Sequence, residues 1–185
     1  MIALVGKTAT GKTSICEELI KLGKNKIVTT TTRPMREGEV EGIDYNFVSD
    51  EKFEQMRNNN EFVETTKYNT VYGLWKYGTP FSSLRDDGVI ILNPDGLKAF
   101  KNLGIDCFIF YIETPISIIR KRLEQRGDSS EESEKRIKTD NEDFKNINLY
   151  FDYIIENDGS KSIKDIAHKI LEISKCYDEI IKTKT

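Results

Sequence analysis

Residues 6–13 read Gly-Lys-Thr-Ala-Thr-Gly-Lys-Thr, which fits the pattern Gly-x-x-x-x-Gly-Lys-Ser/Thr without a mismatch. Glycines at this spacing let the backbone curl so that successive N–H groups point inward at one anion. The apolar run Ile2–Val5 precedes the loop, and the amphipathic stretch Thr13–Leu22 follows it. The loop therefore joins a strand to a helix, whose N-terminal N–H groups add positive potential. This arrangement predicts a site for nucleotide phosphates.

The residues of this loop have individual expected roles. Lys12 is expected to reach the β- and γ-phosphates of the nucleotide, and Thr13 to offer its hydroxyl to Mg²⁺, the expected cofactor. The predicted nucleotide-binding residues are Gly6, Lys7, Thr8, Ala9, Thr10, Gly11, Lys12, Thr13 and Ser14. The alternative is an accidental match in an ordinary strand–turn–helix, which average residue frequencies produce in roughly one chain of this length in a hundred. The loop by itself does not determine what happens to the phosphate.

Further strand-sized apolar runs occur at Val89–Leu92, Cys107–Ile112 and Tyr153–Ile155. Continuous runs of this kind are typical of strands that are buried on both faces of a parallel sheet. Helical patterns at Pro115–Gln125 and Ser160–Cys176 alternate with them. We therefore expect an α/β fold with a parallel sheet flanked by helices.

Two stretches interrupt this alternation. Residues 33–75 are polar, with strand-like pieces at Asp44–Val48 and Glu61–Tyr68 and a short helical signal at Asp50–Arg57, which together predict a small mixed β insertion. Gly127–Ile147 is highly charged and has few core candidates, so we expect a mobile helical cap.

Composition excludes several classes of function. The chain has 185 residues with 37% hydrophobic and 32% charged side chains, which suits one soluble domain. Its net charge of −3 favours neither nucleic acid nor an anionic membrane as a partner. No apolar run reaches the length of a membrane span, and the N-terminus lacks the basic segment of a signal peptide. We expect a cytoplasmic protein, and the sequence does not predict its oligomeric state.

The cysteines and the histidine also limit the chemistry. Cys16, Cys107 and Cys176 are far apart and form no Cys-x-x-Cys pair, so we expect free thiols in a reducing compartment. The one histidine, His168, lies in a predicted helix and is expected at the surface. Nucleophilic catalysis by a Ser–His or Cys–His pair and histidine-based metal sites therefore have little support.

A second long segment, Thr-Thr-Thr-Thr-Arg-Pro-Met-Arg-Glu-Gly-Glu-Val-Glu-Gly-Ile-Asp-Tyr-Asn-Phe-Val at residues 29–48, closely resembles the part of guanylate kinases that binds GMP. The similarity continues in the family's order at residues 61–64, 77–80, 122–127 and 151–158. It therefore runs over nearly the whole chain.

The resemblance implies an organisation for the chain. It is similar to a single guanylate kinase-like domain, residues 1–185, with a P-loop nucleoside-triphosphate-hydrolase-like core. The implied core comprises residues 1–32, 83–121 and 149–185. An acceptor-binding insertion is implied at residues 33–82 and a helical lid at residues 122–148.

Residue chemistry agrees with an acceptor site for GMP. Arg33 and Arg36 can clamp a monophosphate, which carries about two negative charges near neutral pH, and Tyr45 can add a hydroxyl. Guanine offers N1–H and a 2-amino group, and the resemblance assigns Glu64 as the carboxylate that accepts from both. The implied GMP-binding residues are Thr29, Arg33, Arg36, Tyr45, Glu64, Tyr77, Thr79 and Asp95. Taken singly, the arginines are more often a solvated pair, Glu64 an exposed strand residue and Tyr45 a core residue.

The charged cap is similar to the family's lid. Phosphoryl transfer needs positioning and cations where charge moves, and Lys12 supplies one of them. The resemblance assigns Arg122, Arg126 and Arg136 to the same task, closed over ATP so that water is excluded. It also implies that Asn157 lies in the loop that contacts adenine. The alternative interpretation of the cap is a solvated helix whose acidic and basic side chains balance.

Two departures from the family pattern concern the acceptor side. Asn93 replaces the first member of an acidic pair that follows the third core strand, so Mg²⁺ is expected to rely on Thr13, water and phosphates. Tyr77-Gly78-Thr79 lies thirteen residues after Glu64, and Tyr72-Gly73-Leu74 is a second candidate for the same role. We prefer Tyr77, because Thr79-Pro80 would then cap the following helix.

The longer connection, Val71–Lys76, is expected to extend the hairpin beside the acceptor pocket, where Trp75 would pack or shield the substrate. The resemblance thus implies an enzyme that transfers the γ-phosphoryl group of ATP to GMP or dGMP. The alternatives are a P-loop kinase with another small phosphate acceptor and a non-catalytic guanylate-kinase-like binding module.

Overall fold

A five-stranded parallel sheet forms the centre of the fold, which a computed structural model describes for residues 1–70 and 73–182. In spatial order its strands are β2 (Asn25–Lys26), β7 (Gly88–Ile91), β1 (Ile2–Val5), β8 (Phe108–Glu113) and β9 (Tyr153–Glu156). Every pairing in this sheet is parallel. The carboxyl ends of all five strands therefore meet at one edge, where ligands bind in open α/β sheets.

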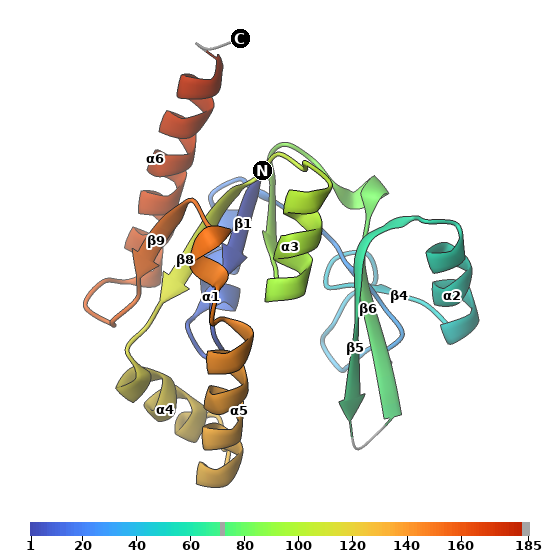
Figure 1. Cartoon of the computed structure of the whole chain (residues 1–185), viewed down its shortest axis with the longest axis horizontal. Coiled ribbons are helices and arrows are strands. Elements are labelled where there is room, and N and C mark those ends of the chain that lie inside the picture. Colours follow the sequence, from blue (N-terminus) through green and yellow to red (C-terminus); the bar gives the residue numbers. More distant parts are fainter. Residues whose placement is uncertain (71–72, 183–185) are drawn as a thin grey trace.

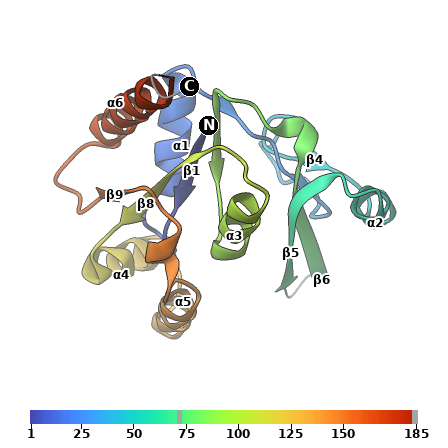
Figure 2. The ribbon, with the colours of Figure 1, turned by 45° about the horizontal axis from the view of Figure 1, so that its top comes forward.

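Helices cover both faces of this sheet, as Figures 1 and 2 show. Helices α1 (Lys12–Lys21) and α6 (Ile163–Lys182) lie on one face, and α3 (Pro94–Asn102) lies on the other. Alternate residues of β1 enter the two cores: Ile2 and Leu4 face α1 and α6, whereas Ala3 faces α3. Burial on both faces explains the continuous apolar runs and confirms the expected α/β architecture. Each fully buried isoleucine or leucine contributes about 1.5–3 kcal/mol.

A four-stranded mixed sheet stands beside the core, as expected for the insertion. Its strands, in spatial order, are β4 (Asn46–Phe47), β3 (Thr30–Thr31), β6 (Gly73–Pro80) and β5 (Phe62–Thr70). Helix α2 (Asp50–Asn58) packs on this sheet through Phe53, whose ring stacks on Phe62 at 4.7 Å. The sheet begins at Thr30, although the implied boundary placed residues up to 32 in the core.

Strands β5 and β6 form the long hairpin that the extra residues predict. The pairing runs from Phe62 opposite Pro80, through a register shift to Glu64 opposite Thr79, and on to Thr70 opposite Gly73. Trp75 lies opposite Tyr68 in this register, farther toward the tip than Tyr77. Tyr72, the second candidate for the acceptor site, and Val71 lie outside the described residues.

The charged stretch forms a helix, as the sequence predicts. Helices α4 (Ile116–Gln125) and α5 (Ser130–Asp143) pack against the phosphate loop in a small core made by Ala9, Ile119, Leu123 and Ile137. A capping box of Ser129 and Glu132 begins α5. The turn η2 (Ile147–Leu149) then leads into β9. This packing holds α5 directly beside the loop.

The expected helix cap at Thr79-Pro80 is wrong. Both residues end β6, and only the 3₁₀ turn η1 (Phe81–Ser83) follows, without a side-chain cap. The Thr79 hydroxyl instead donates to Glu64 Oε1 at 2.7 Å. The threonine hydroxyl is therefore used inside the sheet, where its cross-strand partner lies, and not at a helix start.

The cysteines and the histidine lie as the sequence predicts. Cys16 and Cys107 are buried, Cys176 is exposed, and all three are free thiols. Burial raises the pKa of Cys16 and of Cys107 to about 11, which keeps both thiols protonated. His168 is exposed on α6. Among the described residues, no helix has both the length and the apolarity needed to cross a bilayer.

Candidate active site

The phosphate loop connects β1 to α1, and its shape requires glycine at two positions. A Cβ atom on Gly6 would lie 2.6 Å from the carbonyl oxygen of Ile112. Gly11 has a φ of 92°, and a Cβ atom there would lie 2.6 Å from Asn157 Nδ2. A side chain at either position would thus displace backbone or a buried amide. The two glycines of the sequence pattern are explained by these close approaches.

The ammonium group of Lys12 folds back over the loop. Its Nζ donates to the carbonyl oxygens of Gly6 at 2.7 Å and of Lys7 at 2.6 Å. Burial lowers the pKa of Lys12 to about 8, while the negative charge of Asp140 acts in the opposite direction. The loop therefore holds a half-buried cation that prefers an anionic partner.

Asp140 of α5 supplies an anion at this place. Its Oδ2 accepts a hydrogen bond from the backbone N–H of Thr8 at 2.5 Å. The next residue, Asn141, accepts from Lys7 Nζ at 2.6 Å. Burial raises the pKa of Asp140, and the Thr8 hydrogen bond and the charge of Lys12 oppose that rise. A carboxylate of the chain thus occupies part of the N–H cradle, a contact that sequence reasoning missed.

A cavity of about 640 Å³ opens beside the loop, within the range of about 300–1,000 Å³ typical of small-molecule sites. Its walls come from the loop and the start of α1, the β5–β6 hairpin, the turn between β7 and α3, and α5. In Figures 1 and 2, α5 and the hairpin lie on opposite sides of α3. The predicted site residues that line the cavity are Gly6, Thr8, Lys12, Thr13, Thr29, Tyr45, Glu64, Tyr77 and Thr79.

Glu64 presents its carboxylate to this cavity from β5. Thr79 donates to Oε1 at 2.7 Å, and Thr66 donates to Oε2 at 3.4 Å. Asn93 donates in turn to the Thr66 hydroxyl at 3.1 Å. Burial raises the pKa of Glu64, and the hydroxyl hydrogen bonds partly offset this rise. Both oxygens of the carboxylate are thus held by hydroxyl groups, and the carboxylate faces the phosphate loop across the cavity.

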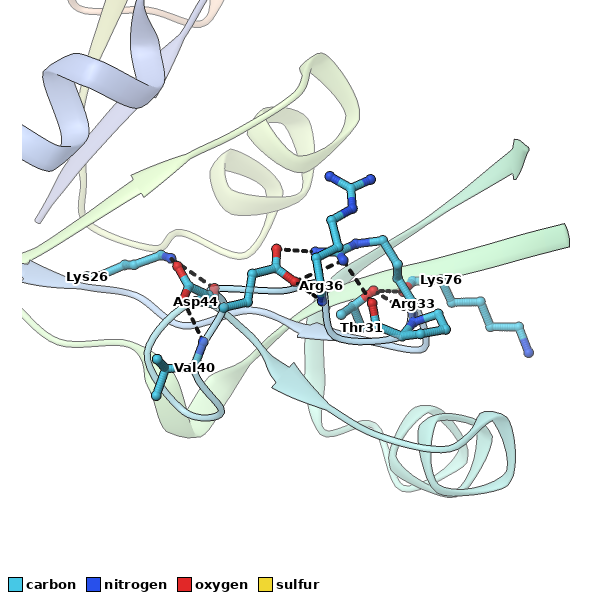
Figure 3. A network of polar contacts seen from close by, with 9 residues as sticks. Lys26, Thr31, Arg33, Arg36, Val40, Asp44 and Lys76 are labelled. Atoms are coloured by element: carbon cyan, nitrogen blue, oxygen red, sulfur yellow. Dashed lines mark hydrogen bonds and ion pairs between the residues drawn. The ribbon is translucent and has the colours of Figure 1, made fainter. Parts of the chain in front are cut away.

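Arg33 and Arg36 do not line the cavity, in contrast to the clamp expected for them. Arg33 is only 4% exposed, and its two terminal nitrogens pair with the two oxygens of Glu39 at 2.6 and 3.0 Å. Its guanidinium also lies 5.3 Å from the ring centre of Tyr45. Glu39 accepts a further bond from the backbone of Arg36, whose side chain is exposed and projects away from its loop (Figure 3).

Asp95 also lies outside the cavity wall, although its neighbours Asn93, Pro94 and Gly96 belong to it. Its side chain is 86% exposed and pairs with Lys98 at 3.3 Å. The reason is local, because Pro94 begins α3 and turns the next side chain along the solvent side of the first helical turn. In this conformation the carboxylate of Asp95 does not reach the cavity.

Arg122 and Asn157 donate hydrogen bonds to backbone carbonyls of the phosphate loop. Arg122 donates to the carbonyl of Ala9 at 3.1 Å and to Asn157 Oδ1 at 3.3 Å. The buried Asn157 donates to the carbonyl of Thr10 at 2.8 Å. Burial, together with the charge of Arg126, lowers the pKa of Arg122. These bonds satisfy backbone carbonyls that the curled loop leaves outside regular structure.

The other two lid arginines lie at the surface. Arg126 follows α4 and is exposed, and Arg136 on α5 pairs with Asp128 at 3.4 Å. Neither side chain lines the cavity. Arg136 borders a second, smaller pocket together with Thr8, and the charge of Arg126, after burial, helps to lower the pKa of Lys12, so both arginines lie near the phosphate loop but outside the main cavity.

A magnesium ion would find one protein ligand of the expected kind. Thr13 is exposed and lines the cavity at the start of α1. Within residues 1–70 and 73–182, no cluster of three histidine, cysteine or acidic side chains could hold a metal. This donor set fits Mg²⁺ bound mainly through phosphates and water, the ligands that this ion usually keeps.

Comparison with known sequences identifies the family. The guanylate kinase family model matches residues 1–174. The chain is 33% identical over 185 residues to a guanylate kinase from Carboxydothermus hydrogenoformans, covering 95% of this chain and 88% of that relative. It is 34% identical over 176 residues to a guanylate kinase from Clostridioides difficile, covering 90% of this chain and 84% of that relative.

Solved structures share the fold. The crystal structure of a guanylate kinase from Anaplasma phagocytophilum has a TM-score of 0.66 at 24% identity and covers 96% of this chain and 85% of that one. A shikimate kinase from Acinetobacter baumannii, in complex with shikimate, has a TM-score of 0.54 at 16% identity, covering 95% and 93% of the two chains. Since the family model spans most of the sequence and the curated relatives exceed 30% identity over most of both chains, this chain belongs to the guanylate kinase family.

Proposed function

We propose that the chain transfers the γ-phosphoryl group of ATP to GMP or dGMP and releases ADP with GDP or dGDP. A phosphate oxygen of the acceptor forms the new P–O bond while the bond between the γ-phosphorus and its bridging oxygen breaks. The attacking oxygen is already anionic, so the reaction needs no general base. The observation that carries this proposal is the position of Glu64, which faces the phosphate loop across one cavity and is held by two hydroxyls.

Glu64 has the role of reading guanine. Its two oxygens can accept from N1–H and from the 2-amino group, and adenine offers no such pair of donors. A base that leaves this carboxylate unpaired is rejected strongly, by as much as about 10⁴- to 10⁵-fold at comparable sites. Thr29, Tyr77 and Thr79 line the same wall and complete the base-binding side.

The acceptor phosphate requires cations near Tyr45. Arg36 is exposed and can turn toward the cavity. Arg33 is already paired with Glu39, so it can bind a phosphate only by giving up part of that pairing. The ion pair with Arg33 holds the pKa of Glu39 at about 2, so this carboxylate stays charged at neutral pH. We assign two roles to Arg33: it orients Tyr45 and the loop that carries Glu39, and it binds the acceptor phosphate. Asp95 joins the site only if the first turn of α3 rearranges.

The donor side involves the loop and the lid. Lys12 is the residue that neutralises the moving phosphoryl group, and it has to leave the loop carbonyls to do so. Arg126 and Arg136 reach the cavity only when α4 and α5 move, which also withdraws Asp140 from Thr8. Arg122 and Asn157 keep the loop in shape. When Mg²⁺ is bound with ATP, Thr13 would hold it, and the ion supplies charge neutralisation at the phosphates.

A coupled ADP-release assay tests this function. GMP, dGMP, AMP, CMP, UMP and dTMP are compared as acceptors with ATP and Mg²⁺, and we expect turnover with the two guanine nucleotides far above the others. A preference for another base overturns the proposal. Absence of turnover with intact nucleotide binding would instead identify a non-catalytic binding module.

A further inference from the structure

Beyond the residues that contact nucleotide, we propose that Asn93 determines base specificity from a distance. It acts as a positioning residue that orients the Glu64 carboxylate through the hydroxyl of Thr66. This inference rests on the proposed function, because it concerns how the same carboxylate reads guanine. It is carried by a chain of hydrogen bonds that runs from the edge of the parallel sheet into the hairpin.

The first step is the orientation of the Asn93 amide. Asn93 is the N-cap of α3, and its Oδ1 accepts from the backbone N–H of Gly96 at 2.7 Å. That N–H group can only donate, so the side-chain atom facing it must be the oxygen. The amide nitrogen therefore faces Thr66, at 3.1 Å from its hydroxyl oxygen. The helix cap thus fixes Asn93 as a donor toward the hairpin.

The second step is the direction of the Thr66 hydroxyl. A hydroxyl has one proton, and here its oxygen accepts from Asn93. The proton is then available to Glu64 Oε2, 3.4 Å away, and does not point back toward Asn93. An acceptor at position 93 would attract that proton and reverse the bond. The identity of residue 93 therefore decides whether Thr66 serves Glu64.

The third step is the orientation of the Glu64 carboxylate by its two hydroxyl donors. Thr79 holds Oε1 at 2.7 Å, and Thr66 holds Oε2, so each oxygen has one hydroxyl donor from the protein. A carboxylate has about four acceptor positions, so positions remain for the donors of a base beside these hydroxyls. Held at both oxygens, the carboxylate has lost the rotation that a ligand would otherwise have to freeze. The same bonds oppose the effect of burial on the pKa of Glu64.

Close packing keeps the three residues in register. A Cβ atom on Gly96 would lie 3.2 Å from Asn93 Oδ1 and 3.6 Å from Glu64 Cγ, so a larger residue at the start of α3 would crowd Asn93 and contact Glu64. Glu64 and Thr66 are alternate residues of β5 and face the cavity together. Thr65 between them is exposed and points to the other face of the strand.

Substitutions at positions 93 and 66 test the relay. Asn93→Asp keeps an oxygen for the helix cap but cannot donate to Thr66, and it adds a charge near Glu64. Asn93→Ser also caps but is too short to reach Thr66, so it removes the donor without adding charge. We expect the KM for GMP to rise about tenfold in Asn93→Asp and about threefold to fivefold in Asn93→Ser, with kcat and the KM for ATP within twofold of wild type.

Variants at Thr66, with a control at Thr65, test the same relay independently of the helix cap. Thr66→Val should raise the KM for GMP about fivefold, Thr66→Ser should restore it to within twofold, and Thr65→Val one residue away should leave it unchanged. Thermal unfolding of each variant shows that it is folded, and the Thr66 variants test the relay even if a change at the cap destabilises α3.

The outcomes separate the two proposals. A wild-type chain without a preference for guanine nucleotides overturns the proposed function and the relay together. A wild-type chain with that preference, whose Asn93→Asp and Thr66→Val variants keep the KM for GMP, overturns the relay alone. Equal increases in the KM for GMP and for ATP also overturn it, because they would reflect a general distortion of the cavity.

Discussion

On the loop side of the cavity, Lys12 donates to carbonyls of its own loop and the Thr8 N–H group donates to Asp140. On the hairpin side, Thr79 and Thr66 donate to Glu64, a carboxylate that still has acceptor positions directed at a base. A phosphate has to replace the bonds on the loop side, whereas guanine adds bonds on the hairpin side. Nucleotide binding is therefore expected to reorganise the phosphate loop, whereas Glu64, the base-reading part of the acceptor site, is already held in place.

The largest expected effect comes from Lys12→Ala. This change removes the half-buried cation of the loop side, and we expect kcat to fall about a thousandfold, as for loss of a key electrostatic contact in the transition state. Steady-state kinetics with ATP and GMP measure the loss, and thermal unfolding controls for folding. A variant that keeps a tenth of the activity would show that the reorganising loop does not depend on Lys12.

On the hairpin side, Glu64→Gln should raise the KM for GMP about a hundredfold. The amide turns one acceptor into a donor, which then faces a donor of guanine. The KM for ATP should stay within twofold, because the change lies on the opposite wall of the cavity. Equal losses for both nucleotides would contradict a division of the cavity into two independent sides.

The pKa of Lys12 makes the loop side sensitive to pH. In the free protein burial lowers that pKa to about 8, and a bound phosphate favours the charged amine. As pH rises above 8, the free enzyme loses the proton that ATP binding requires, so affinity for ATP falls. We expect the KM for ATP to rise about tenfold between pH 7 and pH 9, while the KM for GMP changes less. A flat profile for ATP would show that Lys12 stays charged throughout.

Asp140→Asn tests whether the internal carboxylate competes with ATP. The amide can still accept from Thr8 but carries no charge, so we expect the KM for ATP to fall about threefold to fivefold. Glu142→Gln removes a charge from an exposed position on the same helix and serves as the control. An increase in the KM for ATP would mean that Asp140 assists binding instead of opposing it.

Sequence alone predicted the framework well. The loop pattern and the apolar runs predicted strands β1, β7, β8 and β9 and helices α1, α4 and α6, because burial on both faces leaves a continuous apolar signature. Helix α3 was not predicted, and a helix was expected after Pro80, where only the turn η1 follows. The pairing of Glu64 with Thr79 across one hairpin also agrees with the resemblance.

The contacts that sequence reasoning missed join distant elements. Asp140 lies 132 residues from Thr8, in a charged helix whose pattern is typical of a solvated surface. The bond between Asn93 and Thr66 spans 27 residues and depends on how α3 meets the hairpin. Arg33 was expected at the phosphate, but its guanidinium pairs with Glu39, six residues away. Local sequence patterns do not show which side chain a given polar group will bind.

The carboxylate of Asp140 also changes which anions can use the loop. Because Asp140 belongs to the same chain, it competes for the Thr8 N–H group whatever the surrounding solution contains. A lone inorganic phosphate or sulfate gains too few contacts to displace it. ATP brings three phosphates and an adenine and can outcompete Asp140. The contact between α5 and Thr8 therefore favours ligands that make several contacts with the loop over a lone phosphate or sulfate.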